Sequence, residues 1–218
     1  MKNNAVYLLC LISTISLTAQ ENINETWSTV LHLNSGYSLS TKDWEYTHPY
    51  ILGNGGSFTG RIAGTYEESY SFSGGLELSK DYFGFQANLG IFPAKFSIKK
   101  QVDPGLTQAR NDVYSYTAIY LEAEGILFPL GNKADQISTF FKIGLGGMTT
   151  TGDISNNLLS ISCNAGTRIF ISENFGMDLS LKFRYMLLYN VKLADEISAA
   201  NGVSLSSFIT NVGVIYQF

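Results

Sequence analysis

Apolar and polar residues alternate along this chain in runs that are long for a globular protein. The clearest run covers residues 175–190, where the odd positions from Phe175 to Tyr189 are all apolar or aromatic. The even positions include Gly176, Asp178 and Lys182. An α-helix would mix these two sets on every face, whereas a strand separates them onto opposite faces. The pattern therefore predicts a β-strand, and one longer than the usual five or six residues.

Seven further segments carry the same period of two. They are residues 29–39, 69–79, 83–96, 113–128, 137–149, 159–172 and 206–218. Single-chain bacterial membrane barrels have an even number of strands, and these segments make eight. Residues 57–66 also have the pattern of a strand. We assign them to the first outer loop, where they extend a hairpin beyond the membrane.

The predicted connections alternate between long and short. The long ones are residues 41–68, 97–112, 151–157 and 191–205, and the short ones are 80–82, 129–136 and 173–174. Short periplasmic turns and long extracellular loops are typical of membrane barrels. The fold class predicted is all-β, an eight-stranded antiparallel up-and-down transmembrane β-barrel with both ends in the periplasm. A soluble β-sandwich would alternate too, but strand length and the segment described next favour the barrel.

Residues 1–20 have the three parts of a secretory signal peptide, with Lys2 before an apolar run and small residues at the end. This predicts a barrel domain of residues 21–218 and export to the bacterial outer membrane. Cys10 follows Leu9, which is too large to precede a lipidated cysteine. The later chain has no apolar run long enough for a spanning helix, so it can enter a membrane only as a closed barrel.

The composition of the chain limits which partners and sites it can have. Charged residues make up 15% of the chain, which also holds 21 glycines, 14 phenylalanines and 13 tyrosines. Without Lys2 the chain has 13 basic and 18 acidic residues, a net charge of −5 that argues against a nucleic-acid partner. Beyond the signal, Cys163 is the one remaining cysteine. It cannot form an intramolecular disulfide or a CxxC metal site, and no metal or cofactor is expected.

The end of the chain carries a second motif. Phe208, Val212, Val214, Tyr216 and Phe218 place apolar residues at every second position before a terminal aromatic residue. This resembles the C-terminal strand of outer-membrane barrels. The resemblance implies that the barrel assembly machinery reads Val214, Tyr216 and Phe218 as a signal. The mature chain as a whole resembles the OmpA/OmpX-like, porin-family or PorT-like barrels, without the periplasmic domain of OmpA.

The strand registers place charges of both signs on the lumen side. In an eight-stranded barrel the interior is just wide enough for side chains to fill it, so these charges are expected to pair with one another. A narrow, charge-gated pore is the alternative. The predicted lumen charge network comprises Glu77, Glu122, Glu124, Lys142, Arg168, Asp178, Lys182 and Arg184.

Outside this predicted network, few residues suggest a catalytic or binding site. His32 and His48 are the two histidines, and neither has a nucleophile at a spacing that indicates catalysis, so the chain is not expected to be an enzyme. The first loop holds four aromatics, Trp44, Tyr46, Tyr50 and Phe58, among glycines. They suit adhesion or partner contact, or alternatively an aromatic belt at the level of the lipid headgroups.

Two classes of function therefore remain open. The first is a structural, adhesion or partner-binding barrel, surrounded by outer-membrane lipid, whose loops contact a surface ligand or an envelope protein of unknown identity. The second is a narrow gated pore or small-solute channel. A soluble lipid-binding barrel in the periplasm is a third, weaker reading.

Overall fold

The fold is made of strands throughout the part of the chain that the structure describes. The computed structural model describes residues 27–39, 41–51, 57–103, 106–131, 137–153, 157–188, 191–193, 197–199 and 203–218. The strands are β1 Ser28–Ser38, β2 Thr41–Ile51, β3 Ser57–Glu68, β4 Tyr70–Lys80, β5 Phe83–Asp103, β6 Leu106–Leu127, β7 Ile137–Gly152, β8 Asn157–Phe170, β9 Phe175–Leu188, β10 Val191–Leu193, β11 Ile197–Ala199 and β12 Val203–Gln217. The predicted signal peptide lies outside the described residues.

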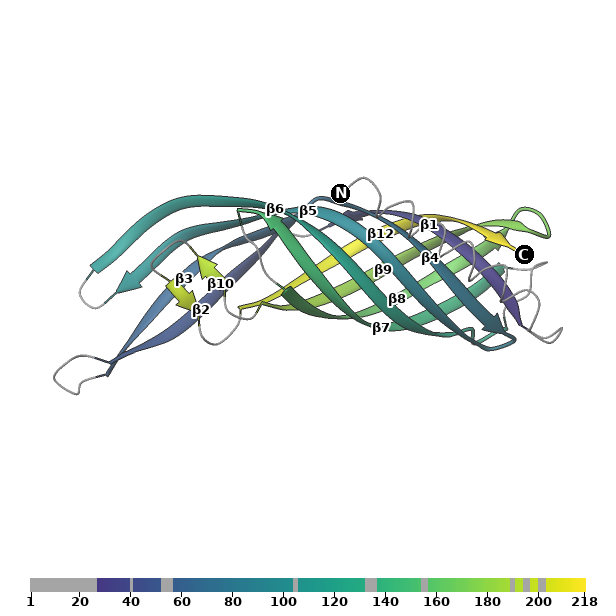
Figure 1. The fold of residues 1–218 in the computed structure, drawn as a ribbon, viewed down its shortest axis with the longest axis horizontal. Helices are drawn as coiled ribbons and strands as arrows, with labels where there is room; N and C mark the ends of the chain where they lie inside the picture. The colour runs from purple at the N-terminus through teal and green to yellow at the C-terminus, as the bar shows by residue number, and fades with distance from the viewer. Residues whose placement is uncertain are drawn as a thin grey trace, which may run out of the picture.

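Eight of these strands close into a barrel (Figure 1). Each strand pairs antiparallel with its neighbours in the order β5-β4-β1-β12-β9-β8-β7-β6, and β6 pairs back onto β5. The first and last strands meet along nine residue pairs, from Val30 opposite Gln217 to Ser38 opposite Ile209. This confirms the predicted all-β fold class and its eight-stranded antiparallel topology.

One end of the barrel, which we call the turn rim, carries short connections. Lys80 pairs with Phe83 across a tight turn in which Asp81 has a φ of 47°, a left-handed conformation that Asp tolerates better than most residues. The predicted turn at residues 173–174 joins β8 to β9 at the same rim. The C-terminus ends there as well, where Phe218 donates a backbone hydrogen bond to Thr29.

The opposite end, which we call the hairpin rim, carries much longer structure (Figure 1). β5 and β6 are 21 and 22 residues long and stay paired up to Asp103 opposite Leu106. The prediction of a loop over residues 97–112 was therefore wrong. β2 and β3 form a second hairpin, and β3 pairs with the part of β5 nearest the hairpin rim, from Ala94 to Val102. The surplus strand predicted at residues 57–66 is thus part of a hairpin that extends the barrel.

The polarity of β5 reverses along its length, which explains why its end was misplaced. Between Phe83 and Ile91 the outward positions are apolar, while inward positions include Gln86 and Asn88. Beyond Pro93 the inward positions are Phe96 and other buried apolar residues, and the outward positions are polar. The period of two continues through this reversal. The strand therefore passes from an apolar to a polar outer face while it stays paired with β6.

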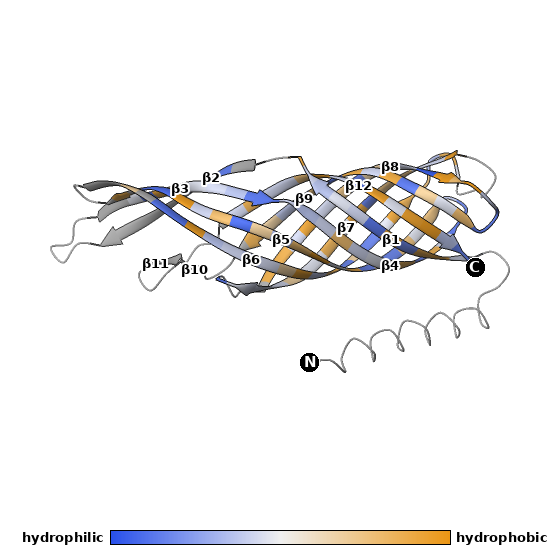
Figure 2. Cartoon of the chain, turned by 90° about the horizontal axis from the view of Figure 1, so that it is seen from above, coloured by the Kyte–Doolittle hydropathy of each residue, from blue (hydrophilic) through white to orange (hydrophobic). Residues whose placement is uncertain are grey.

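The outer face between the rims is covered by exposed apolar side chains. Figure 2 shows hydrophobic and hydrophilic positions alternating along the barrel strands. Phe85, Leu121, Ile143 and Leu145 each have more than 60% of their surface exposed. An apolar area of this extent is not found on monomers that live in water. Among the described residues, no helix is long and apolar enough to cross a membrane.

Candidate functional site: the barrel interior

The interior of the barrel is filled by charged side chains that contact one another. The structure places all eight predicted lumen residues inside the wall, each at most 6% exposed. It adds two that the sequence analysis had not included, His32 and Glu68, which are also buried. We call these ten residues the interior network. Among the described residues they comprise five acids, four permanent bases and one histidine.

Arg168 organises the network near the turn rim. Its Nη1 and Nη2 donate to the two oxygens of Glu77 at 2.9 and 2.8 Å, and its Nε donates to Asp178 Oδ1 at 3.0 Å. Glu77 and Arg168 are 91 residues apart in sequence, because β4 and β8 face each other across the lumen. A fully paired guanidinium of this kind offsets the cost of burying three charges.

His32 lies beside the same two carboxylates. Its Nε2 is 2.9 Å from Glu77 Oε2 and its Nδ1 is 3.5 Å from Asp178 Oδ2, although neither contact has good hydrogen-bond geometry. A neutral imidazole has one N–H, whereas an imidazolium has two. Both ring nitrogens of His32 face a carboxylate of the interior network. The sequence analysis did not link His32 to a partner.

Lys182 occupies the middle of the lumen. Its ammonium forms an ion pair with Glu122 and another with Glu124 at 3.0 Å. Ser162 donates a short hydrogen bond to Glu122, and Asn88 donates to Glu124 at 2.8 Å. These contacts come from β5, β6, β8 and β9, so they tie opposite walls of the barrel together.

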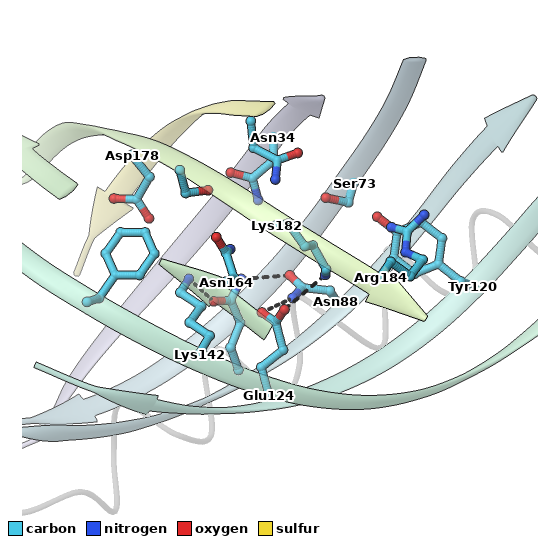
Figure 3. Close-up of a pocket in the computed structure, with 14 residues that line it drawn as sticks. Asn34, Ser73, Asn88, Tyr120, Glu124, Lys142, Asn164, Asp178, Lys182 and Arg184 are labelled. Atoms are coloured by element: carbon cyan, nitrogen blue, oxygen red, sulfur yellow. Dashed lines mark hydrogen bonds and ion pairs between the residues drawn. The ribbon is translucent and has the colours of Figure 1, made fainter. Parts of the chain in front are cut away.

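Lys142 is bound differently, because its ammonium contacts no carboxylate among the residues that the structure describes. Its Nζ donates to Gln86 Oε1 at 2.6 Å and lies 4.6 Å from the centre of the Phe140 ring. Gln86 in turn donates to Asn88, which links Lys142 to Glu124 (Figure 3). An enclosed polar cavity of about 30 Å³ lies beside this chain, bordered by Asn164 among others. That volume holds about two water molecules.

Arg184 lies at the end of the interior network that is nearest the hairpin rim. Its Nη1 donates to Glu68 Oε1 at 2.8 Å, and Ser207 donates to the other oxygen of Glu68 at 2.9 Å. The guanidinium lies against two adjacent aromatic rings, 4.7 Å from the centre of Phe92 and 4.6 Å from that of Tyr120. The sequence analysis missed Glu68 because it placed this residue in the first loop.

On the hairpin-rim side of Arg184 the lumen is closed by an apolar cluster, which we call the outer plug. Its members pack together with almost no exposed surface, so the residues that the structure describes leave no open path past them. They are Ile62, Tyr66, Phe92, Ala94, Phe96, Ile98, Tyr116, Ala118, Tyr120, Met148, Leu158, Met186 and Leu205. At the turn rim a smaller cluster of Ile126, Phe128 and Phe140 closes the other end.

The other predicted site residues are placed as follows. Trp44, Tyr46 and Tyr50 belong to β2 and Phe58 to β3, but their side chains lie outside what the structure describes. Val214, Tyr216 and Phe218 point outward at the turn rim, 42–51% exposed. Cys163 is exposed on the outer face of β8. Among the described residues, no group of three or more His, Cys, Asp or Glu side chains is arranged to hold a metal ion.

A closed antiparallel barrel of eight strands, with an apolar outer face and a polar interior, has the fold of the small outer-membrane barrels. A comparison with solved structures agrees with this class. The outer membrane protein OprG from Pseudomonas aeruginosa is similar with a TM-score of 0.52 and 8% sequence identity, over 88% of this chain and 96% of OprG. At this identity the likeness concerns the fold alone.

Two further solved structures are similar at lower scores. The outer membrane protein AlkL, solved in DMPC lipid bilayers, has a TM-score of 0.47 and 12% identity over 88% of this chain and 90% of AlkL. Neisserial surface protein A has a TM-score of 0.46 and 11% identity over 89% of this chain and the whole of that protein. No family model and no curated protein sequence matches this chain.

Proposed function

We propose that this chain is a bacterial outer-membrane barrel that acts through the structure projecting from its hairpin rim, in adhesion or in binding a partner. The observation that carries the proposal is the contrast between its two parts. The lumen is filled by paired charges and closed by the outer plug. The hairpins β2–β3 and β5–β6 extend well beyond the closed barrel (Figure 1).

The membrane location rests on the outer face. On β5 the outward apolar positions run from Phe83 to Ile91. Nine residues at about 3.3 Å each, tilted by about 40°, rise about 22 Å, close to the ~25 Å apolar band of outer-membrane barrels. The predicted signal peptide and the fold shared with OprG, an outer membrane protein, support the same location.

The orientation follows from the lengths of the connections. Short turns face the periplasm in such barrels, so the turn rim and Phe218 belong there and the hairpin rim belongs outside the cell. Trypsin added to intact cells should then cleave at the exposed Lys99 and Lys100 of β5. Lys80, beside the turn at Asp81, should be protected until the outer membrane is opened. The reverse pattern would refute this orientation.

Val214, Tyr216 and Phe218 are proposed to be the signal that the barrel assembly machinery recognises. They form the lipid-facing side of the last strand, and Phe218 closes the barrel beside Thr29. The surrounding outer-membrane lipid is the other partner that this location implies.

A narrow pore is the competing function, since charges line the lumen. Conductance in planar bilayers separates the two. We expect no steady channels from the wild-type protein, because the outer plug leaves no open path. Steady channels that disappear in Arg184→Ala would refute the closed lumen and favour the pore.

The binding role itself is tested by trimming the β2–β3 hairpin. Replacing residues 48–58 by a short turn removes its tip and leaves Ile62 and Tyr66 of the outer plug in place. Cells that express the trimmed protein should lose binding to the surfaces that wild-type cells bind, while the barrel still migrates as a folded species on unboiled gels. Unchanged binding in a panel of surface-adhesion and envelope cross-linking assays would refute a role for this hairpin.

A further inference from the structure

A large groove interrupts the outer wall of the barrel. It has a volume of about 590 Å³ and crosses β12, β1, β4, β5 and β6. Its walls are mainly apolar and include Leu33, Phe72, Leu89, Ile91 and Val212. Small-molecule sites have volumes of about 300–1,000 Å³, so the groove is large enough to hold one ligand.

The groove arises from two small outward-facing residues among large ones. One row of directly paired residues runs Val214, Leu33, Gly74 and Leu89 across four strands. The next row, towards the hairpin rim, has Ser35 opposite Phe72. Gly74 and Ser35 are therefore diagonal neighbours, and the missing side-chain volume at both positions makes the hollow.

We infer that this groove binds one acyl chain of an outer-leaflet lipid, an inference that rests on the proposed membrane location. The pair of Tyr37 and Tyr70 lies one row further towards the hairpin rim, and both side chains are more than half exposed. Tyrosines of this kind occur at the level of the lipid headgroups. The groove therefore begins just below that level on the proposed outer side, where an acyl chain starts.

The shape of the groove also favours a chain over a second copy of the barrel. The groove is concave, and the raised residues at its edge, such as Phe72 and Leu33, are 53% and 60% exposed. A second barrel has a convex wall that would contact these raised residues and leave the hollow empty. A flexible hydrocarbon chain can enter the hollow and fill it, and the burial of its methylene groups stabilises the complex.

The test uses the full mature chain in nanodiscs of phosphatidylethanolamine and phosphatidylglycerol. A trace of phosphatidylethanolamine carries a photoreactive diazirine in the middle of one acyl chain. After irradiation, mass spectrometry maps the lipid adducts on each strand. We expect a severalfold excess of adducts on β1 and β4 over β7 and β8 in the wild-type protein.

Two matched substitutions decide whether the hollow causes that excess. A Cβ at Gly74 would lie 3.4 Å from Leu33 Cδ2, an ordinary contact, so the backbone can carry a side chain there and Gly74→Leu places a leucine in the groove. Gly147 also faces outward and has nothing within 4 Å of the same position, so Gly147→Leu adds equal bulk away from the groove. We expect Gly74→Leu to abolish the excess and Gly147→Leu to keep it. Ser35→Leu serves as a second filling variant if Gly74→Leu does not fold.

Each other outcome overturns a distinct claim. Adducts spread evenly around the wild-type barrel would indicate ordinary surrounding lipid and refute the binding groove. An excess that survives in folded filling variants would refute the assignment to Gly74 and Ser35. Protection of the groove together with protein–protein cross-links would identify a second copy as the occupant. A chain with no lipid adducts at all would refute the proposed membrane location itself.

Discussion

Removal of the Arg168 charge should destabilise the barrel strongly, because two buried carboxylates pair with it. In Arg168→Met the side chain keeps most of its length but loses four hydrogen bonds to Glu77 and Asp178. Both carboxylates then stay buried without their guanidinium partner, and His32 lies beside them. Breaking a buried ion pair on one side costs about 3–5 kcal/mol. We expect the free energy of unfolding to fall by about that amount.

The assay is urea unfolding in phospholipid vesicles, followed by the fraction that migrates as folded barrel on unboiled gels. The control is Arg61→Met on the β2–β3 hairpin, where Arg61 pairs with Glu45 but its side chain is 61% exposed. An exposed pair contributes about 0–1 kcal/mol, so this substitution should change little. The same residue type and the same replacement then differ only in burial.

A triple variant tests whether charge compensation is the cause. Arg168→Met combined with Glu77→Gln and Asp178→Asn removes the buried charges together with their partner. The triple variant leaves no uncompensated charge at these three positions, and that charge is what makes a one-sided removal costly, so part of the loss should be recovered. If the triple variant is no more stable than the single one, or if Arg168→Met behaves like Arg61→Met, the interior network does not stabilise the barrel in the way described.

Three further predictions follow from the same interior and from the last strand. His32→Gln removes the buried ring whose Nε2 lies 2.9 Å from Glu77 Oε2, and should lower the free energy of unfolding by about 1–3 kcal/mol in the same urea assay. Gly90→Val should cost a similar ~1–3 kcal/mol, since its Cβ would lie 2.3 Å from the Tyr120 ring; Gly125→Val, with nothing within 4 Å, is the control and should be tolerated. Deletion of Phe218 should slow assembly in cells, seen as unfolded chain in the periplasm, while refolding into vesicles changes little. Equal defects in both settings would contradict an assembly signal.

The strands of the barrel were predictable because each face meets one uniform medium over the membrane. Along β9, for example, Leu179 and Leu181 face outward while Asp178 and Lys182 are buried, as the alternation indicated. A one-residue error in register would have exchanged the two sets. This is why local sequence placed eight charged residues inside without any knowledge of which strands are neighbours.

The pairing of those charges was not predictable from the same pattern. Arg168 meets Glu77 because the closure of the barrel brings β8 opposite β4, and no local signal records that closure. Glu68 was missed for a related reason. It lies at the end of β3, a segment that has the pattern of a strand but was assigned to the first outer loop. Its partner Arg184 was therefore left without a carboxylate in the sequence analysis.

The reversal of polarity on β5 connects the fold to the proposed function. Between the turn rim and Pro93 the wall is apolar outside and polar inside. Between Pro93 and the hairpin rim the apolar residues, among them Phe96 and Ile98, point inward. A wall with water on its outside can bury apolar residues only in its own interior. The outer plug is thus the hydrophobic core of the projecting part, and it lies where a channel would have to open. The contacts between the outer plug residues stabilise the hairpins, and the same contacts close the lumen. Stable hairpins at this rim and an open lumen therefore exclude each other in this fold, which is why we propose binding through the hairpins and not conduction.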